Sequence, residues 1–68
     1  MVQEYKAEFE QELDGRWIAE FPALPGAMAY GLTKEEAFAA AQAIALRIIA
    51  DRVEQSHQGA EDLRFAQG

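Results

Sequence analysis

Glutamates near the N-terminus are the residues with the clearest capacity for chemistry in this 68-residue chain. Four of them share one parity of a single predicted strand: Glu4, Glu8, Glu10 and Glu12. A two-metal nuclease needs several carboxylates that converge on one spot. Alternate positions of a strand instead spread side chains along one face, and nothing in the sequence brings Asp51 or Asp62 to them. We interpret the row as a solvated sheet face or an acidic contact surface, and we predict no metal site.

Ser56 and His57 are the other pair with catalytic residue types. A serine hydrolase requires a third group that orients the histidine inside a protected site. Two adjacent residues at the end of a predicted helix do not meet that requirement, and a polar helix end beside free carbonyl groups accounts for them. The glycines at 15, 26 and 31 fall in turns and match no phosphate-binding spacing. We therefore predict no catalytic residue, no cofactor and no enzyme.

The charge balance predicts the chemistry of a partner. Twelve acidic residues against six basic residues give a formal net charge of −6. Such a surface repels phosphate backbones and attracts basic proteins, so we expect a basic protein partner and no direct nucleic-acid binding. A chain this short buries only about 60% of its unfolded surface, and it has no cysteine for disulfides or thiolate zinc sites. We expect a homo-oligomer, a dimer or a tetramer, or a partner to supply the missing stability.

The distribution of apolar residues excludes some locations. No run approaches the about 20 apolar residues of a membrane span, and the N-terminus lacks the basic-then-apolar pattern of a signal peptide. We expect a cytoplasmic protein that does not contact membranes. The length predicts one domain over residues 1–68.

Alternation of apolar and charged residues predicts the strands that position the glutamates. Residues 2–13 alternate, with Tyr5, Ala7, Phe9 and Leu13 on the inner face, and residues 16–21 alternate after an Asp-Gly hairpin turn. A Pro-Gly dipeptide at 25–26 predicts a type II turn before a short strand at 27–30. A final strand is expected over 62–66, parallel to the first strand.

A helix is predicted from Lys34 to about Gln55, because Thr33 and Glu36 form a capping box before an alanine-rich segment. Five residues form its sheet-facing stripe, with Phe38 and Ile49 at the margins: Ala37, Ala41, Ile44, Ala45 and Ile48. Four others lie roughly opposite: Ala39, Leu46, Ala50 and Val53. This second stripe is either incidental or a candidate oligomer interface. The predicted fold class is α+β, a three- to four-stranded sheet covered by one helix in the order βββαβ.

A set of short motifs in this order resembles the HicB-type antitoxin family. They are the Asp-Gly turn, Trp-x-Ala at 17–19, Pro-x-Leu-Pro-Gly at 22–26, Gly-x-Thr at 31–33 and Glu-Glu-Ala at 35–37. The resemblance implies a partial ribonuclease H-like fold without catalytic carboxylates. It also implies a binding module that masks a small basic toxin of the HicA type, which degrades mRNA.

The sequence departs from the family pattern at three places. Ala27 and Leu32 replace residue types common after Pro-Gly and before the helix cap, and the 68 residues contain no C-terminal DNA-binding module. The leading hypothesis is a non-catalytic antitoxin-like domain that binds its toxin through Glu4, Glu8, Glu10 and Glu12. The alternative is an orphan structural or regulatory module that self-associates and has no toxin partner.

Overall fold

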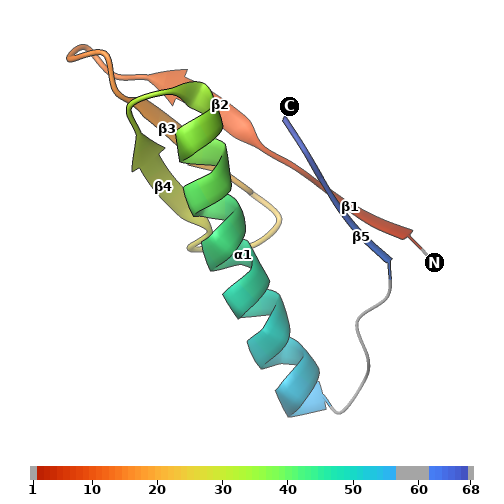
Figure 1. The fold of residues 1–68 in the computed structure, drawn as a ribbon. Helices are drawn as coiled ribbons and strands as arrows, with labels where there is room; N and C mark the ends of the chain where they lie inside the picture. The colour runs from red at the N-terminus through yellow and green to blue at the C-terminus, as the bar shows by residue number, and fades with distance from the viewer. Residues whose placement is uncertain (1, 57–61, 68) are drawn as a thin grey trace.

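Five strands and one helix make up the computed structural model, which describes residues 2–56 and 62–67. Their order along the chain is β1 (Val2–Lys6), β2 (Glu8–Gln11), β3 (Trp17–Glu20), β4 (Met28–Gly31), α1 (Lys34–Ser56) and β5 (Asp62–Ala66). The helix lies along one side of the strands (Figure 1). The fold is α+β, as predicted, with a group of strands before the helix and one strand after it.

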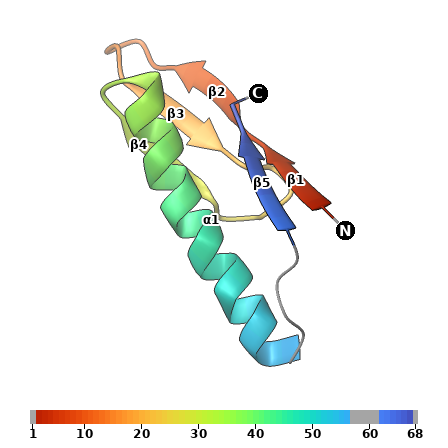
Figure 2. The ribbon, with the colours of Figure 1, turned by 45° about the vertical axis from the view of Figure 1, so that its right-hand side comes forward.

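The strands form an antiparallel sheet in the order β2-β3-β4 and a parallel pair of β1 with β5. The predicted parallel pairing of the last strand with the first is confirmed (Figure 2). The single strand predicted over residues 2–13 is wrong, because the chain divides at Ala7 into β1 and β2. The N–H of Ala7 donates to the carbonyl of Ala66 at 2.8 Å. The first half of the segment therefore pairs with β5, while the second half pairs with β3.

The hairpin between β2 and β3 has a three-residue loop, and the predicted two-residue Asp-Gly turn is wrong. The N–H of Glu12 donates to the carbonyl of Arg16 at 2.7 Å, and the N–H of Gly15 donates back to Glu12 at 3.0 Å. Within this loop, Gly15 has a positive φ, of 95°. A left-handed glycine after a turn is the usual form of a three-residue hairpin loop. Leu13 consequently sits at the loop tip, fully exposed, and not on the inner face as predicted.

Two consecutive turns connect β3 to β4. Leu24 donates its N–H to the carbonyl of Phe21, and Ala27 donates its N–H to the carbonyl of Leu24, both at 2.9 Å. Gly26 has a φ of 93°, which confirms the predicted type II turn at Pro25 and Gly26. The residue shared by the two turns, Leu24, is fully buried.

The helix begins at the predicted capping box. The N–H of Glu36 donates to the hydroxyl of Thr33 at 3.1 Å, and the carboxylate of Glu36 accepts from the N–H of Leu32 at 3.1 Å. The N–H of Glu36 thus finds its acceptor as in a capping box, whereas the carboxylate of Glu36 accepts from Leu32 and not from Thr33. The carboxylate reaches one residue further back than the cap residue.

Small side chains dominate the core between helix and sheet. The buried residues of the described chain are Ala7, Ala19, Phe21, Leu24, Ala27, Ala37, Ala41, Ala45 and Ile49. The helix buries every fourth residue, so Ile49 belongs to the centre of the stripe, whereas Ile44 and Ile48 are half-buried. The prediction that Ile49 lies at the margin is wrong. Alanines at the contact allow a close approach of helix and sheet, but they bury little area per residue.

Aromatic side chains join the parallel pair to the rest of the molecule. The ring of Phe21 lies edge-on to Phe38 of α1 at 5.7 Å and to Phe65 of β5 at 5.4 Å. Tyr5 of β1 stacks on Phe65 at 5.6 Å. The predicted inward orientation of Tyr5, Phe9 and Trp17 is confirmed, because all three pack against the core.

The molecule exposes more surface than a compact chain of its mass. Its accessible surface is 4747 Å² at 7.6 kDa, whereas a folded monomer of that mass has about 4,300 Å². Its radius of gyration is 12.6 Å, against about 11 Å expected for a chain of this length. No helix in the described part of the chain is both long and apolar enough to cross a bilayer.

Candidate functional site

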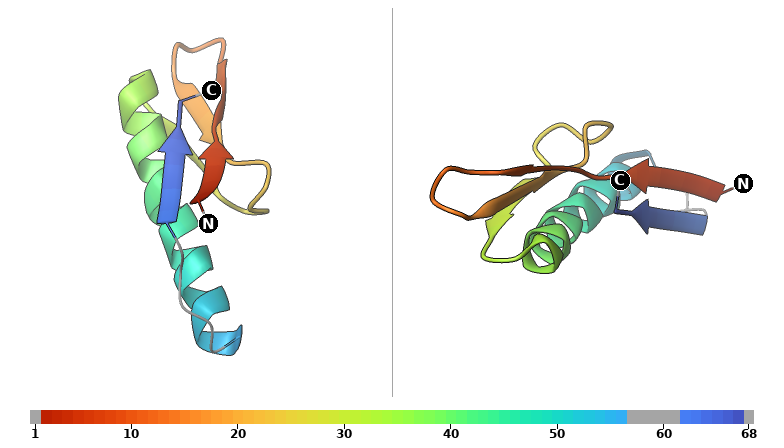
Figure 3. Two further views of the ribbon diagram at one scale, coloured as in Figure 1. Left: turned by 90° about the vertical axis from the view of Figure 1, so that its right-hand side faces the viewer. Right: turned by 90° about the horizontal axis from the view of Figure 1, so that it is seen from above.

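The face of the β2-β3-β4 sheet that points away from α1 carries two of the predicted site residues, Glu8 and Glu10. Strand alternation and register determine its membership: Phe9, Trp17 and Ala19 pack inward, so their neighbours in each strand point outward. Figure 3 shows α1 along one side of these three strands, and the outward neighbours belong to the other side. We call the six outward residues the outer sheet face: Glu8, Glu10, Ile18, Glu20, Met28 and Tyr30.

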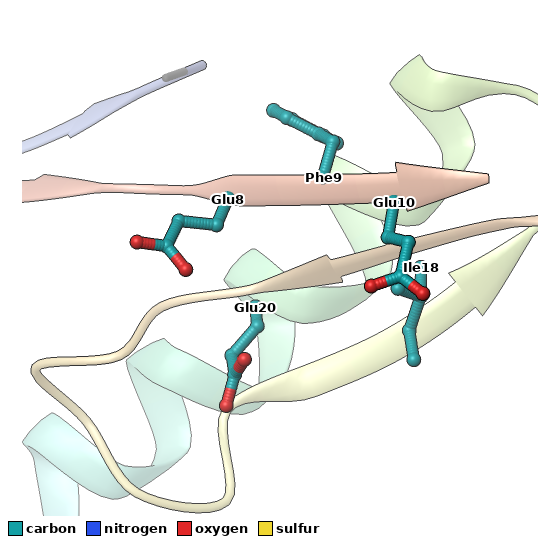
Figure 4. A pocket seen from close by; sticks show the side chains of 5 residues that line it. All are labelled: Glu8, Phe9, Glu10, Ile18 and Glu20. Atoms are coloured by element: carbon teal, nitrogen blue, oxygen red, sulfur yellow. The ribbon is translucent and has the colours of Figure 1, made fainter.

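Three carboxylates lie on this face. Glu8 lies directly opposite Glu20 in the β2-β3 register, and Glu10 lies opposite Ile18. Their side chains extend to the same side of the sheet while Phe9 extends to the other (Figure 4). With Phe9 and Ile18, the three glutamates line a shallow hollow of about 100 Å³.

Among the described residues, no ion pair balances these three carboxylates. The ion pairs join Lys6 to Glu4 at 4.0 Å and Arg16 to Asp14 at 2.8 Å, and neither involves a glutamate of the outer sheet face. Like charges directly opposite each other in a sheet are destabilising. The repulsion between Glu8 and Glu20 therefore opposes folding of the isolated chain and is relieved when a cation approaches.

The half of the outer sheet face nearest β4 is apolar. Met28 is 47% exposed and Tyr30 is 49% exposed, and Ile18 beside them is half-buried. The Arg16 guanidinium lies over the Tyr30 ring at 4.8 Å from its centre, where Asp14 holds it.

Asp14 itself belongs to the hairpin loop. The backbone N–H of Arg16 donates to its carboxylate at 3.0 Å, and the guanidinium donates at 2.8 Å. These hydrogen bonds, the backbone one first, hold the pKa of the Asp14 carboxyl below its ordinary value of 3.8. Because Arg16 is engaged by this carboxylate, it is not available to balance the glutamates of the outer sheet face.

Of the four predicted contact glutamates, the structure brings only Glu8 and Glu10 together. Glu4 lies in β1 opposite Arg64 of β5 and forms an ion pair with Lys6. Glu12 is half-buried beyond the end of β2, outside the hollow. Sequence reasoning left out Glu20, although its parity in residues 16–21 places it outward.

The predicted oligomer stripe on α1 is only partly accessible. Ala39, Leu46 and Ala50 are exposed, and Leu46 is 45% exposed. Val53 is half-buried and packs against the core. The exposed stripe is therefore shorter than the sequence predicted and has one large apolar side chain.

Metal ligation requires several donor side chains close together. Within residues 2–56 and 62–67, no group of three or more His, Cys, Asp or Glu side chains could hold a metal ion. His57, the possible catalytic partner of Ser56, lies outside the described residues. What the described geometry offers is an exposed sheet face that is acidic on one side and apolar on the other.

Comparison with known proteins supplies no relative for this chain. No protein-family model, curated protein or solved structure matches it.

Proposed function

We propose that this chain is a non-catalytic, HicB-type antitoxin-like domain that binds and neutralises a small basic toxin that degrades mRNA. The observation that carries the proposal is the unbalanced carboxylate group of Glu8, Glu10 and Glu20 on an uncovered sheet face. The sequence resemblance supplies the class of partner. We place the activity in the cytoplasm, where such a toxin meets its mRNA substrate.

Binding alone accounts for neutralisation in this proposal. The acidic face attracts a basic protein before contact and selects against acidic ones, which raises the association rate more than the affinity. Once docked, the domain covers the surface through which the toxin reaches RNA. No bond is made or broken by the chain itself.

Co-expression tests this function. The chain is expressed with a tagged copy of the small basic protein encoded beside its gene, and the two are purified together and assayed on an mRNA transcript. We expect a stable complex and an intact transcript, with cleavage by the basic protein alone. A basic neighbour that neither co-purifies nor loses its ribonuclease activity contradicts the proposal, as does the absence of such a neighbour.

The alternative, a self-associating module without a toxin partner, is favoured by one specific observation. Leu46 is exposed on a helix whose buried face is mainly alanine. A second copy that covers Leu46 would add apolar burial that the small alanines do not supply. The substitution Leu46→Glu should convert an oligomer to monomer in light scattering. An oligomer that survives it is not held by this stripe.

A further inference from the structure

The outer sheet face changes chemistry from one edge to the other. Its apolar residues, Met28 and Tyr30, come from β4, whereas Glu8 and Glu10 come from β2. Neighbouring strands lie about 4.8 Å apart, so the apolar row and the acidic row are separated by about 10 Å. β3, which lies between β2 and β4, carries one apolar residue, Ile18, and one acidic residue, Glu20.

We propose that the occupant of this face is an amphipathic basic segment of a partner protein, with its cations over β2 and its apolar side chains over β4. This proposal rests on the proposed function. It specifies the kind of toxin segment that the domain covers and the face of the domain that covers it. A purely cationic partner would leave Met28 and Tyr30 exposed. A purely apolar one would bury three carboxylates without counter-charge, which is costly.

Strand geometry gives the spacing of the partner's cations. Glu8 and Glu10 are two residues apart, which is about 6.7 Å along β2. Lysine or arginine residues at i and i+4 of a helix lie about 6 Å apart and match this spacing. The side chain of Ile18 in the hollow offers an apolar surface for the methylene stem of one such residue, while its charge lies between Glu8 and Glu20.

Charge complementarity excludes the other classes of occupant. A second copy docked with its β2 over β2 would set three carboxylates against three others, and the Arg16 of each copy is engaged by its own Asp14. Nucleic acid is repelled for the same reason. A metal ion lacks a set of ligands among the described residues. A basic protein segment is the class that both the charges and the apolar row accept.

Titration with defined peptides tests the proposal. The probes are a helical peptide with lysines at i and i+4 beside a leucine face, and an oligolysine of equal charge. Backbone amide shifts of the labelled chain report where each one binds. We expect the helical peptide to shift the amides of β2, β3 and β4, and to bind more tightly than oligolysine. Equal affinity for the two probes, or shifts confined to α1, overturns the proposal.

Matched charge reversals locate the contact. Glu10→Lys should weaken the helical peptide about fivefold or more, since it replaces an attractive pair by a repulsive one. Glu54→Lys makes an equal change in net charge at an exposed position of α1, and it should change the affinity for the helical peptide less than about twofold. Met28→Ser should weaken binding of the helical peptide and leave the affinity for oligolysine unchanged. Equal effects of the two reversals indicate attraction to net charge alone and contradict the proposal.

The outcome separates this inference from the proposed function. Peptide binding at the outer sheet face without toxin neutralisation leaves the face standing and removes the antitoxin role. Toxin neutralisation that is unaffected by Glu10→Lys keeps the antitoxin role and refutes this face as its surface.

Discussion

Gly31 is the position where the smallest substitution should do the most damage to the fold. It ends β4 directly against the first turn of α1. A methyl group built there would lie 2.8 Å from the carbonyl carbon of Glu36, 2.9 Å from the Cα of Ala37, and against the backbone nitrogen of Ala37. These are backbone atoms, which cannot rotate away. Gly31 has no positive φ, so glycine is required here by space and not by backbone conformation.

The cost of Gly31→Ala follows from how far the helix must move. Ordinary van der Waals contact requires about 3.4 Å or more, so β4 and α1 must separate by roughly 0.5–1 Å. The capping bonds of Thr33 and Glu36 and the fully buried Ala37 resist that movement. Overpacking costs about 1–3 kcal/mol, and we expect the upper end. A domain of this length has roughly 3–10 kcal/mol of stability, so Tm should fall by about 10 °C or more.

Urea and thermal unfolding followed by circular dichroism measure this loss. The matched control is Gly15, which has a φ of 95° and no atom within 4 Å of an added methyl group. Asparagine tolerates the left-handed conformation, so Gly15→Asn should lie close to wild type, while Gly31→Asn should be at least as harmful as Gly31→Ala. Ala37→Gly should not rescue Gly31→Ala, because the clash is with backbone. A Gly31→Ala protein with the wild-type midpoint refutes this packing argument.

Three further changes probe other parts of the structure. Glu20→Lys should stabilise the isolated chain by about 0.2–1 kcal/mol, because it turns the repulsion with Glu8 into attraction; a lower urea midpoint contradicts this. Thr33→Ala should cost about 1 kcal/mol of unfolding free energy through the lost cap, while Thr33→Ser should cost little, and equal losses argue against the cap. The lowered pKa of Asp14 stabilises the folded state above about pH 4, and this contribution is lost as pH falls through the folded-state pKa. The urea midpoint of wild type should therefore exceed that of Asp14→Asn near neutral pH and approach it in acid; a gap that is constant with pH contradicts the role of the Arg16 hydrogen bonds.

Much of the fold was predictable because local chemistry determines it. Pro25 and Gly26 specify a type II turn by their own backbone preferences, and Thr33 with Glu36 specifies the helix start. The final strand was predicted from its alternation, and its parallel pairing with β1 from the crossover through the helix. The turn and the cap depend on residues that are neighbours in the sequence.

The remainder depends on contacts between distant residues. The apolar alternation continues without interruption through Ala7, so nothing local marks the division into β1 and β2; the pairing with Ala66 of β5 produces it. The same pairing sets Glu4 opposite Arg64 and takes it out of the unbalanced acidic group. Glu20 enters that group because register sets it opposite Glu8, and alternation within one strand does not specify its register with a neighbour.

The most direct test of the account is the affinity of the basic neighbouring protein for a chain that lacks the charges of the outer sheet face. The triple substitution of Glu8, Glu10 and Glu20 to glutamine keeps side-chain size and removes the three charges. Isothermal titration should show binding weakened about tenfold or more relative to wild type, with unchanged circular dichroism and less dependence on salt. Affinity equal to wild type would contradict the claim that the partner binds the outer sheet face. Loss of affinity in Leu46→Glu instead would assign binding to the helix.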